Sequence, residues 1–174
     1  MATVVLTLLG TDRAGLVSAV SQLITERGGS WERSQMAHLA GTFAGIVEID
    51  VPSAQVDALV SGVEALGSQG LRVSVERSGE APPASTEGHR MSLHLVGADR
   101  PGIVAEVSAL LARHGVNLEE LSTQVVEAPM AGGTLFEADA VAVVPDSADT
   151  TALRSALEAL ANELMVDLDL HEGS

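Results

Sequence analysis

Gly10-Thr11-Asp12-Arg13-Ala14-Gly15-Leu16-Val17 returns 87 residues later as Gly97-Ala98-Asp99-Arg100-Pro101-Gly102-Ile103-Val104. In both places the octapeptide lies between an alternating apolar run and an amphipathic run with helical spacing. A repeat of this length is a whole small domain, so the sequence predicts two copies of one fold. The repeated turn is then the first place to look for a binding site.

The residues around each octapeptide predict the same six elements. Alternating apolar residues predict a first strand, and an i, i+4, i+7 apolar stripe that stops at Gly28 or Gly115 predicts a first helix. A β-hairpin, a second helix after Pro52 or Pro145, and a last strand follow. The hairpin strands are expected at 31–39 and 42–51, and at 117–127 and 134–144; the last strands are expected at 71–75 and 166–170.

The order β-α-β-β-α-β is that of the ferredoxin-like unit, in which two helices cover one face of a four-stranded antiparallel sheet. We therefore predict the α+β class and two domains, 1–77 and 90–174. Residues 78–89 contain Gly79, Pro82, Pro83 and Ser85 and have no apolar periodicity, so they are predicted to be a linker.

The composition excludes several classes of protein. The net charge of −15, with nine Arg and no Lys, opposes the phosphate neutralisation on which nucleic-acid binding depends. No apolar run approaches the roughly 20 residues that a membrane-spanning helix needs, and no leader-like segment opens the chain, so we expect a cytoplasmic protein with no membrane contact. The absence of Cys excludes disulfides and thiolate chemistry. No cofactor is expected.

The repeated turn has features of an anion site. We expect Gly10 and Gly97 to let the backbone turn sharply, and Gly15 and Gly102 to let a ligand approach the main chain. The start of the following helix presents N–H donors with partial positive charge, which favours a carboxylate.

Pro101 is expected at the first helical position, where its missing N–H costs nothing. The alternative for this turn is purely structural: Asp12 and Asp99 cap the helices, and the glycines serve only the turn.

Residues 97–103, followed by a helix and then by Gly115-Val116-Asn117-Leu118, resemble the ACT domain, a family of regulatory amino-acid-binding modules with the βαββαβ fold. Two such copies without an attached enzyme resemble the glycine cleavage system transcriptional repressor family. The resemblance implies a sensor of a small amino acid such as glycine or serine. It also implies control of transcription through a DNA-binding protein partner. We further expect the protein to be a homo-oligomer.

In the family, ligands lodge between paired domains, held by the backbone of the turn and by a polar residue that opens the second strand. The first copy departs from the family pattern at Ala14, where proline is usual, and at Ser30, where asparagine is usual. We therefore expect the second copy to hold the stronger site. The implied ligand-binding residues are Asp99, Arg100, Pro101, Gly102, Ile103 and Asn117 in the second copy, and Asp12, Arg13, Ala14, Gly15, Leu16 and Ser30 in the first.

No catalytic or metal-binding set is predicted. The five histidines lack metal-ligand spacing, and the carboxylate pairs Glu137/Asp139 and Asp167/Asp169 share a strand face expected to be wet. Two alternatives to a sensor remain. One is a small enzyme that uses Arg13 and Arg100 at the anion site. The other is an interaction module that dimerises through its sheet edges without a ligand.

Overall fold

The computed structural model describes residues 1–77, 88–128 and 132–173. The chain divides into two compact units, Met1–Pro82 and Pro83–Ser174, and each contains one complete domain. Within the described ranges, no helix is both long enough and apolar enough to cross a membrane.

The first domain contains β1 (Ala2–Thr11), α1 (Leu16–Glu26), β2 (Ser30–Leu39), β3 (Thr42–Val51), α2 (Val56–Ala65) and β4 (Leu71–Arg77). Two short 3-10 turns flank α2, η1 (Ser53–Gln55) and η2 (Leu66–Gln69). The second domain contains β5 (Gly88–Ala98), α3 (Ile103–Arg113), β6 (Asn117–Glu127), β7 (Thr134–Pro145), α4 (Thr150–Leu164) and β8 (Val166–Glu172).

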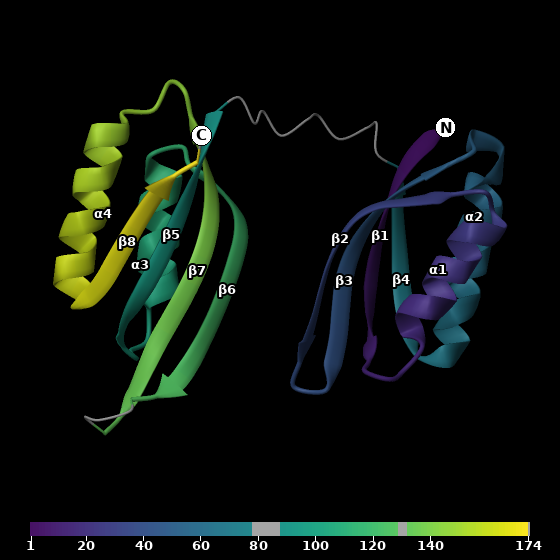
Figure 1. The fold of residues 1–174 in the computed structure, drawn as a ribbon, viewed down its shortest axis with the longest axis horizontal. Coiled ribbons are helices and arrows are strands. Elements are labelled where there is room, and N and C mark those ends of the chain that lie inside the picture. Colours follow the sequence, from purple (N-terminus) through teal and green to yellow (C-terminus); the bar gives the residue numbers. More distant parts are fainter. Residues whose placement is uncertain (78–87, 129–131, 174) are drawn as a thin grey trace. The chain divides into compact units, whose positions relative to one another are not determined.

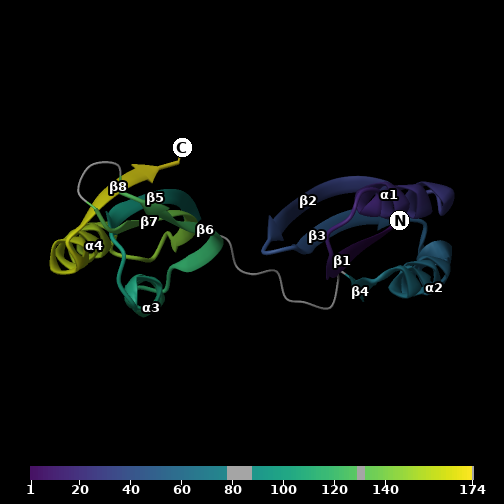
Figure 2. The ribbon, with the colours of Figure 1, turned by 90° about the horizontal axis from the view of Figure 1, so that it is seen from below.

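Each domain is a four-stranded antiparallel sheet with its two helices on one face (Figure 1). The strand order is β2-β3-β1-β4 in the first sheet and β6-β7-β5-β8 in the second. Figure 2 shows the same layering in each domain from a perpendicular direction. The predicted α+β class and the two βαββαβ units are confirmed.

The cores lie between helices and sheet because the apolar residues follow the expected periods. In β1 the side chains of Val4, Leu6 and Leu8 are buried, while Thr7 and Leu9 lie on the open face of the sheet. Burial of one such aliphatic side chain contributes about 1.5 to 3 kcal/mol. Trp31 packs against the first core at the position that Leu118 occupies in the second.

The second core is less continuous than the first. The first domain has one buried cluster, whereas the second has two, joined through the partly buried Val107, Leu160 and Leu168. The core side of β7 contributes Ala138 and Ala140, whose small side chains leave space under α3.

The edge strands β2 and β6 carry the same irregularity. The register with the neighbouring strand shifts between Trp31 and Arg33, and again between Leu118 and Glu120. One extra residue in each strand, Glu32 or Glu119, therefore has no partner in the ladder, as in a β-bulge.

One predicted boundary differs from the structure. Gly88 and His89, assigned to the linker from the sequence, belong to β5, where they pair with Pro145 and Val144 of β7. The rest of the predicted linker, 78–87, lies outside the described residues.

Helix α4 follows the Pro145-Asp146-Ser147 segment, as predicted, and begins at Thr150. Pro145 ends β7, and the helix is capped by Asp149, whose side chain accepts a hydrogen bond from Ala152 N at 2.9 Å.

Candidate functional site

The two repeated turns have nearly the same backbone. Gly15 (φ 94°) and Gly102 (φ 98°) are the N-caps of α1 and α3, and both adopt the left-handed conformation that glycine tolerates best. Each accepts the first helical hydrogen bond, from Ala19 N and Glu106 N respectively, at 2.9 Å. Neither helix start receives a side-chain cap. Since glycine has no side chain, the N-cap residue itself supplies no acceptor to the first N–H groups of either helix.

Two sequence expectations about these turns were wrong. Asp12 and Asp99 do not cap the helices, because the N-cap position belongs to glycine. Pro101 lies before the N-cap, so it is not the first helical residue, which is Ile103. The backbone N–H groups of Asp12 and Asp99 instead bond to the carbonyl oxygens of Gly41 and Thr134, which ties each turn to the neighbouring hairpin.

The prediction that Gly10 and Gly97 make the sharp turn was wrong. Gly10 and Gly97 lie inside strands, where a Cβ atom would stand 2.6 Å from Gly70 O or 2.4 Å from Val166 Cγ1. They therefore permit the close approach of β4 and β8. Gly15 and Gly102 make the turn, and the space over Gly15 is open, with nothing within 4 Å of a Cβ placed there.

The side chains of the predicted site residues point in different directions. Leu16 and Ile103 are 6% and 2% exposed and belong to the cores, so only their backbone is available to a ligand. The turn residues Asp12, Arg13, Ala14 and Gly15, and Asp99, Pro101 and Gly102, are exposed, and Arg100 is half-buried.

An ion pair that involves a predicted site residue lies at each turn. In the first, His38 Nε2 lies 3.7 Å from Asp12 Oδ2. In the second, Arg100 Nη2 lies 3.3 and 3.4 Å from the two carboxylate oxygens of Glu106. Glu106 lies one turn into α3, and sequence reasoning missed it. The sequence does contain a signal for Glu106, namely a difference between the copies: the matching residue of the first copy, 87 positions earlier, is Ala19.

The polar residues that open the second strands lie far from the turn of their own domain. Asn117 pairs with Val143, which also pairs with Arg90 near the start of β5, whereas the turn follows Ala98 at the other end of that strand. Eight residues of strand separate the two ends by on the order of 25 Å. Ser30 is placed in the same way in the first domain. One domain alone does not bring both halves of the predicted site together.

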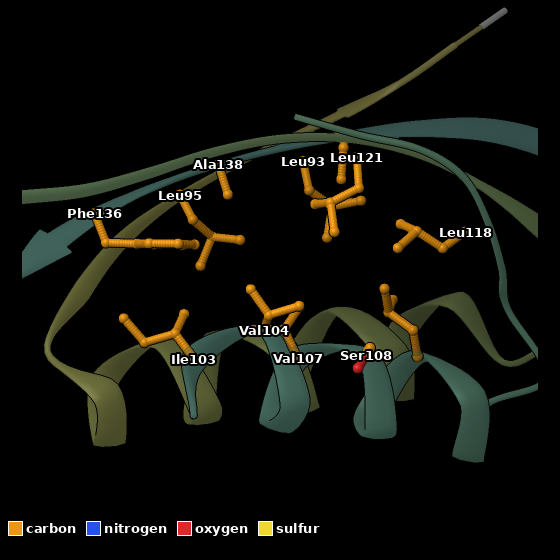
Figure 3. A pocket seen from close by; sticks show the side chains of 12 residues that line it. Leu93, Leu95, Ile103, Val104, Val107, Ser108, Leu118, Leu121, Phe136 and Ala138 are labelled. Carbon is orange, nitrogen blue, oxygen red and sulfur yellow. The ribbon is translucent and has the colours of Figure 1, made fainter. Parts of the chain in front are cut away.

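An apolar pocket lies under the start of α3 (Figure 3). Leu95 and Phe136 point into it from the sheet, and Ile103, Val104 and Val107 from the helix. Its free space of about 20 Å³ has room for about one water molecule. The pocket is too small for an amino acid in this conformation, so it does not replace the turn as the candidate site.

In the parts of the chain that the structure describes, no group of three or more His, Asp or Glu side chains is placed to hold a metal ion. His94 Nδ1 lies 2.7 Å from Asp139 Oδ1 on the open face of the second sheet, with both side chains well exposed. Glu137 on the same strand accepts a hydrogen bond from Gln124 at 2.7 Å. These carboxylates face solvent, in agreement with the sequence interpretation.

Comparison with known proteins gives consistent matches over both domains. A family model described as the ACT domain matches residues 2–76 and again residues 89–171. The glycine cleavage system transcriptional repressor of Escherichia coli (strain K12) is 25% identical over 160 residues, which are 92% of this chain and 84% of the repressor.

Solved structures show the same tandem arrangement of elements along the chain. An unknown protein from Galdieria sulphuraria superposes with a TM-score of 0.87 and 31% identity over 99% of each chain. A crystal structure assigned to the glycine cleavage system transcriptional repressors has a TM-score of 0.69 and 20% identity, covering 99% of this chain and 98% of its own; it shows the shared fold alone. This chain belongs to the ACT domain family and contains two copies of the domain.

Proposed function

We propose that this protein is a regulatory amino-acid-binding protein that works through its repeated turns. The observation that carries the proposal is the duplicated helix start, where Gly15 and Gly102 supply no side-chain acceptor to the first N–H donors. Such donors, together with the helix dipole, favour the carboxylate that all amino acids share. Glycine and serine are the first ligands to test, given the similarity to the glycine cleavage system transcriptional repressor.

Asn117 and Ser30 complete the proposed site as hydrogen-bonding partners of the ligand. Each lies at the opposite end of its own domain from the turn. A ligand that contacts both a turn and one of these residues therefore needs a second copy of the domain, from this chain or from another molecule. An asparagine amide offers both donors and an acceptor, whereas serine offers one hydroxyl.

The proposed output is control of a partner protein without catalysis by this chain. The arginine that an enzyme would use at the second turn, Arg100, is paired with Glu106. With a net charge of −15, the protein is a poor direct ligand for DNA, so control of transcription would pass through a DNA-binding protein. A ligand shifts such a system by its different affinity for the two conformations.

The test is calorimetric titration of the full chain with a panel of amino acids that includes glycine and serine. We expect saturable heat with at least one of them, and at least a tenfold loss of affinity in Asn117→Ala. The matched control is Asn162→Ala, which removes an exposed asparagine on α4 and is expected to change nothing. Absence of heat and of any thermal shift across the whole panel would overturn the proposal.

One observation favours an interaction module that associates through its open sheet face, in place of the sheet edges expected from the sequence. Leu9 and Ile46, which are 36% and 51% exposed, line a shallow hollow of about 420 Å³ on the open face of the first sheet. Leu39, which pairs with Thr42 at the end of the hairpin, is 74% exposed. Exposed apolar patches mark interaction surfaces. Two results together would favour this alternative. The protein would bind no amino acid in the titration, and its oligomer would dissociate more readily in Ile46→Ser than in the parent.

A further inference from the structure

The two turns differ in one charged group that lies at the helix start. In the second domain, Glu106 Oε1 is 3.4 Å from the position that a Cβ on Gly102 would take. In the first domain the corresponding residue is Ala19, and nothing lies within 4 Å of the same position on Gly15. The backbones agree within a few degrees at both glycines, so the difference comes from the side chains.

Glu106 acts on the second turn in two ways. Its carboxylate places a negative charge next to Gly102, the N-cap of α3, and this charge opposes the approach of another carboxylate. It also pairs with Arg100, the nearest cation of the turn, through both oxygens at 3.3 and 3.4 Å. The two side chains are 39% and 41% exposed, so the pair meets solvent at the surface where a ligand would arrive.

We propose that Glu106 is a specificity-determining residue that keeps the second turn from binding an external carboxylate. The first turn, with Ala19 in its place, is then the one that receives the carboxylate of the ligand. The inference rests on the proposed function for the choice of amino acids as ligands. The sequence, through Pro101, predicts the stronger ligand site in the second copy. This inference places the stronger site for the carboxylate in the first copy instead.

A site-resolved titration with sodium acetate, the simplest carboxylate, tests this inference without knowledge of the natural ligand. Backbone amide shifts of residues 15–17 and 102–104 in the full chain are followed by NMR, with sodium chloride as the ionic-strength control. In the parent protein, acetate is expected to shift residues 15–17 saturably and to leave 102–104 unchanged. In Glu106→Ala both segments shift, and in Ala19→Glu neither does.

Two further variants separate charge from other effects. Glu106→Gln keeps the size of the side chain and removes its charge, so it is expected to open the second turn as the alanine variant does. Glu158→Ala removes an exposed carboxylate elsewhere, on α4, and is expected to behave as the parent. Glycine added in place of acetate is expected to bind once per chain in the parent and twice in Glu106→Ala.

The outcomes distinguish this inference from the proposed function. Equal acetate shifts at both turns of the parent, or an unchanged second turn in Glu106→Ala, would overturn the role of Glu106. Failure of acetate to shift residues 15–17 in the parent would overturn the assignment of the first turn. Acetate binding in the expected pattern without binding of any amino acid would retain the inference and overturn the proposed function.

Discussion

Gly10→Ala is expected to destabilise the first domain by about 2 to 3 kcal/mol, at the upper end of the cost of overpacking a core. A Cβ atom on Gly10 would lie 2.6 Å from Gly70 O, about 0.8 Å closer than the 3.4 Å at which ordinary contact begins. The obstacle is backbone, and Gly70 is held at φ 83° just before β4, so no side chain can rotate away. Strand β4 must move from β1, which strains the pairing of Gly10 with Leu71.

Trp31 makes the measurement specific to one domain. It is the single Trp of a chain without Tyr, and it packs against the core of the first domain. Its fluorescence during urea unfolding therefore reports this domain alone. With an m-value of about 1 kcal/mol per molar urea, typical of a small domain, the midpoint is expected to fall by about 2 M.

The matched control is Gly67→Ala. A Cβ at Gly67 meets nothing within 4 Å, and its backbone is not left-handed. This variant is expected to leave the domain unchanged or to stabilise it by up to about 1 kcal/mol through the unfolded state. If Gly10→Ala unfolds within about 0.3 M of the parent, a shift near the resolution of linear extrapolation, the close-approach explanation of Gly10 is wrong.

Three further substitutions have expected outcomes. Gly15→Ala places a side chain at φ 94° and is expected to cost about 1 to 2 kcal/mol in urea unfolding; an unchanged midpoint would contradict the strain. Asp149→Ala removes the acceptor of Ala152 N and should cost about 1 kcal/mol in thermal unfolding followed by circular dichroism, while Asp146→Ala should have no effect. Ala140→Val adds two methyl groups toward the apolar pocket and is expected to raise the stability of the second domain by about 1 kcal/mol; a fall would show that the pocket cannot accept them.

The periodicity of apolar residues was sufficient to predict the elements and their order. The hairpin strands at 31–39 and 42–51 match β2 and β3 within one residue, because the alternation of Val47, Ile49 and Val51 reflects their burial on one face. The linker boundary was wrong because Gly88 and His89 belong to β5 only through their pairing with Pro145 and Val144. The sequence between Pro145 and Thr150 contains several helix-start signals, and only the backbone shows that Asp149 is the cap.

The roles of the glycines could not be predicted, because they depend on distant residues. Whether Gly10 turns or permits an approach is decided by Gly70, which is 60 positions away in the chain. The same holds for the site, where the separation of Asn117 from the turn follows from strand register. Comparison of the two copies could have identified Glu106 as a difference, because the matching residue of the first copy is Ala19. Its contact with Arg100 is visible only in the structure.

The paired bulges in β2 and β6 have a consequence for solubility. Both strands lie at the edge of their sheets, where unpaired backbone groups invite strands of other molecules. The unpaired residue of each bulge is a glutamate, Glu32 or Glu119. A foreign strand that extends either sheet loses its register at a charged position, so regular growth into aggregates stops there. Each copy of the domain thereby protects one of its two edge strands.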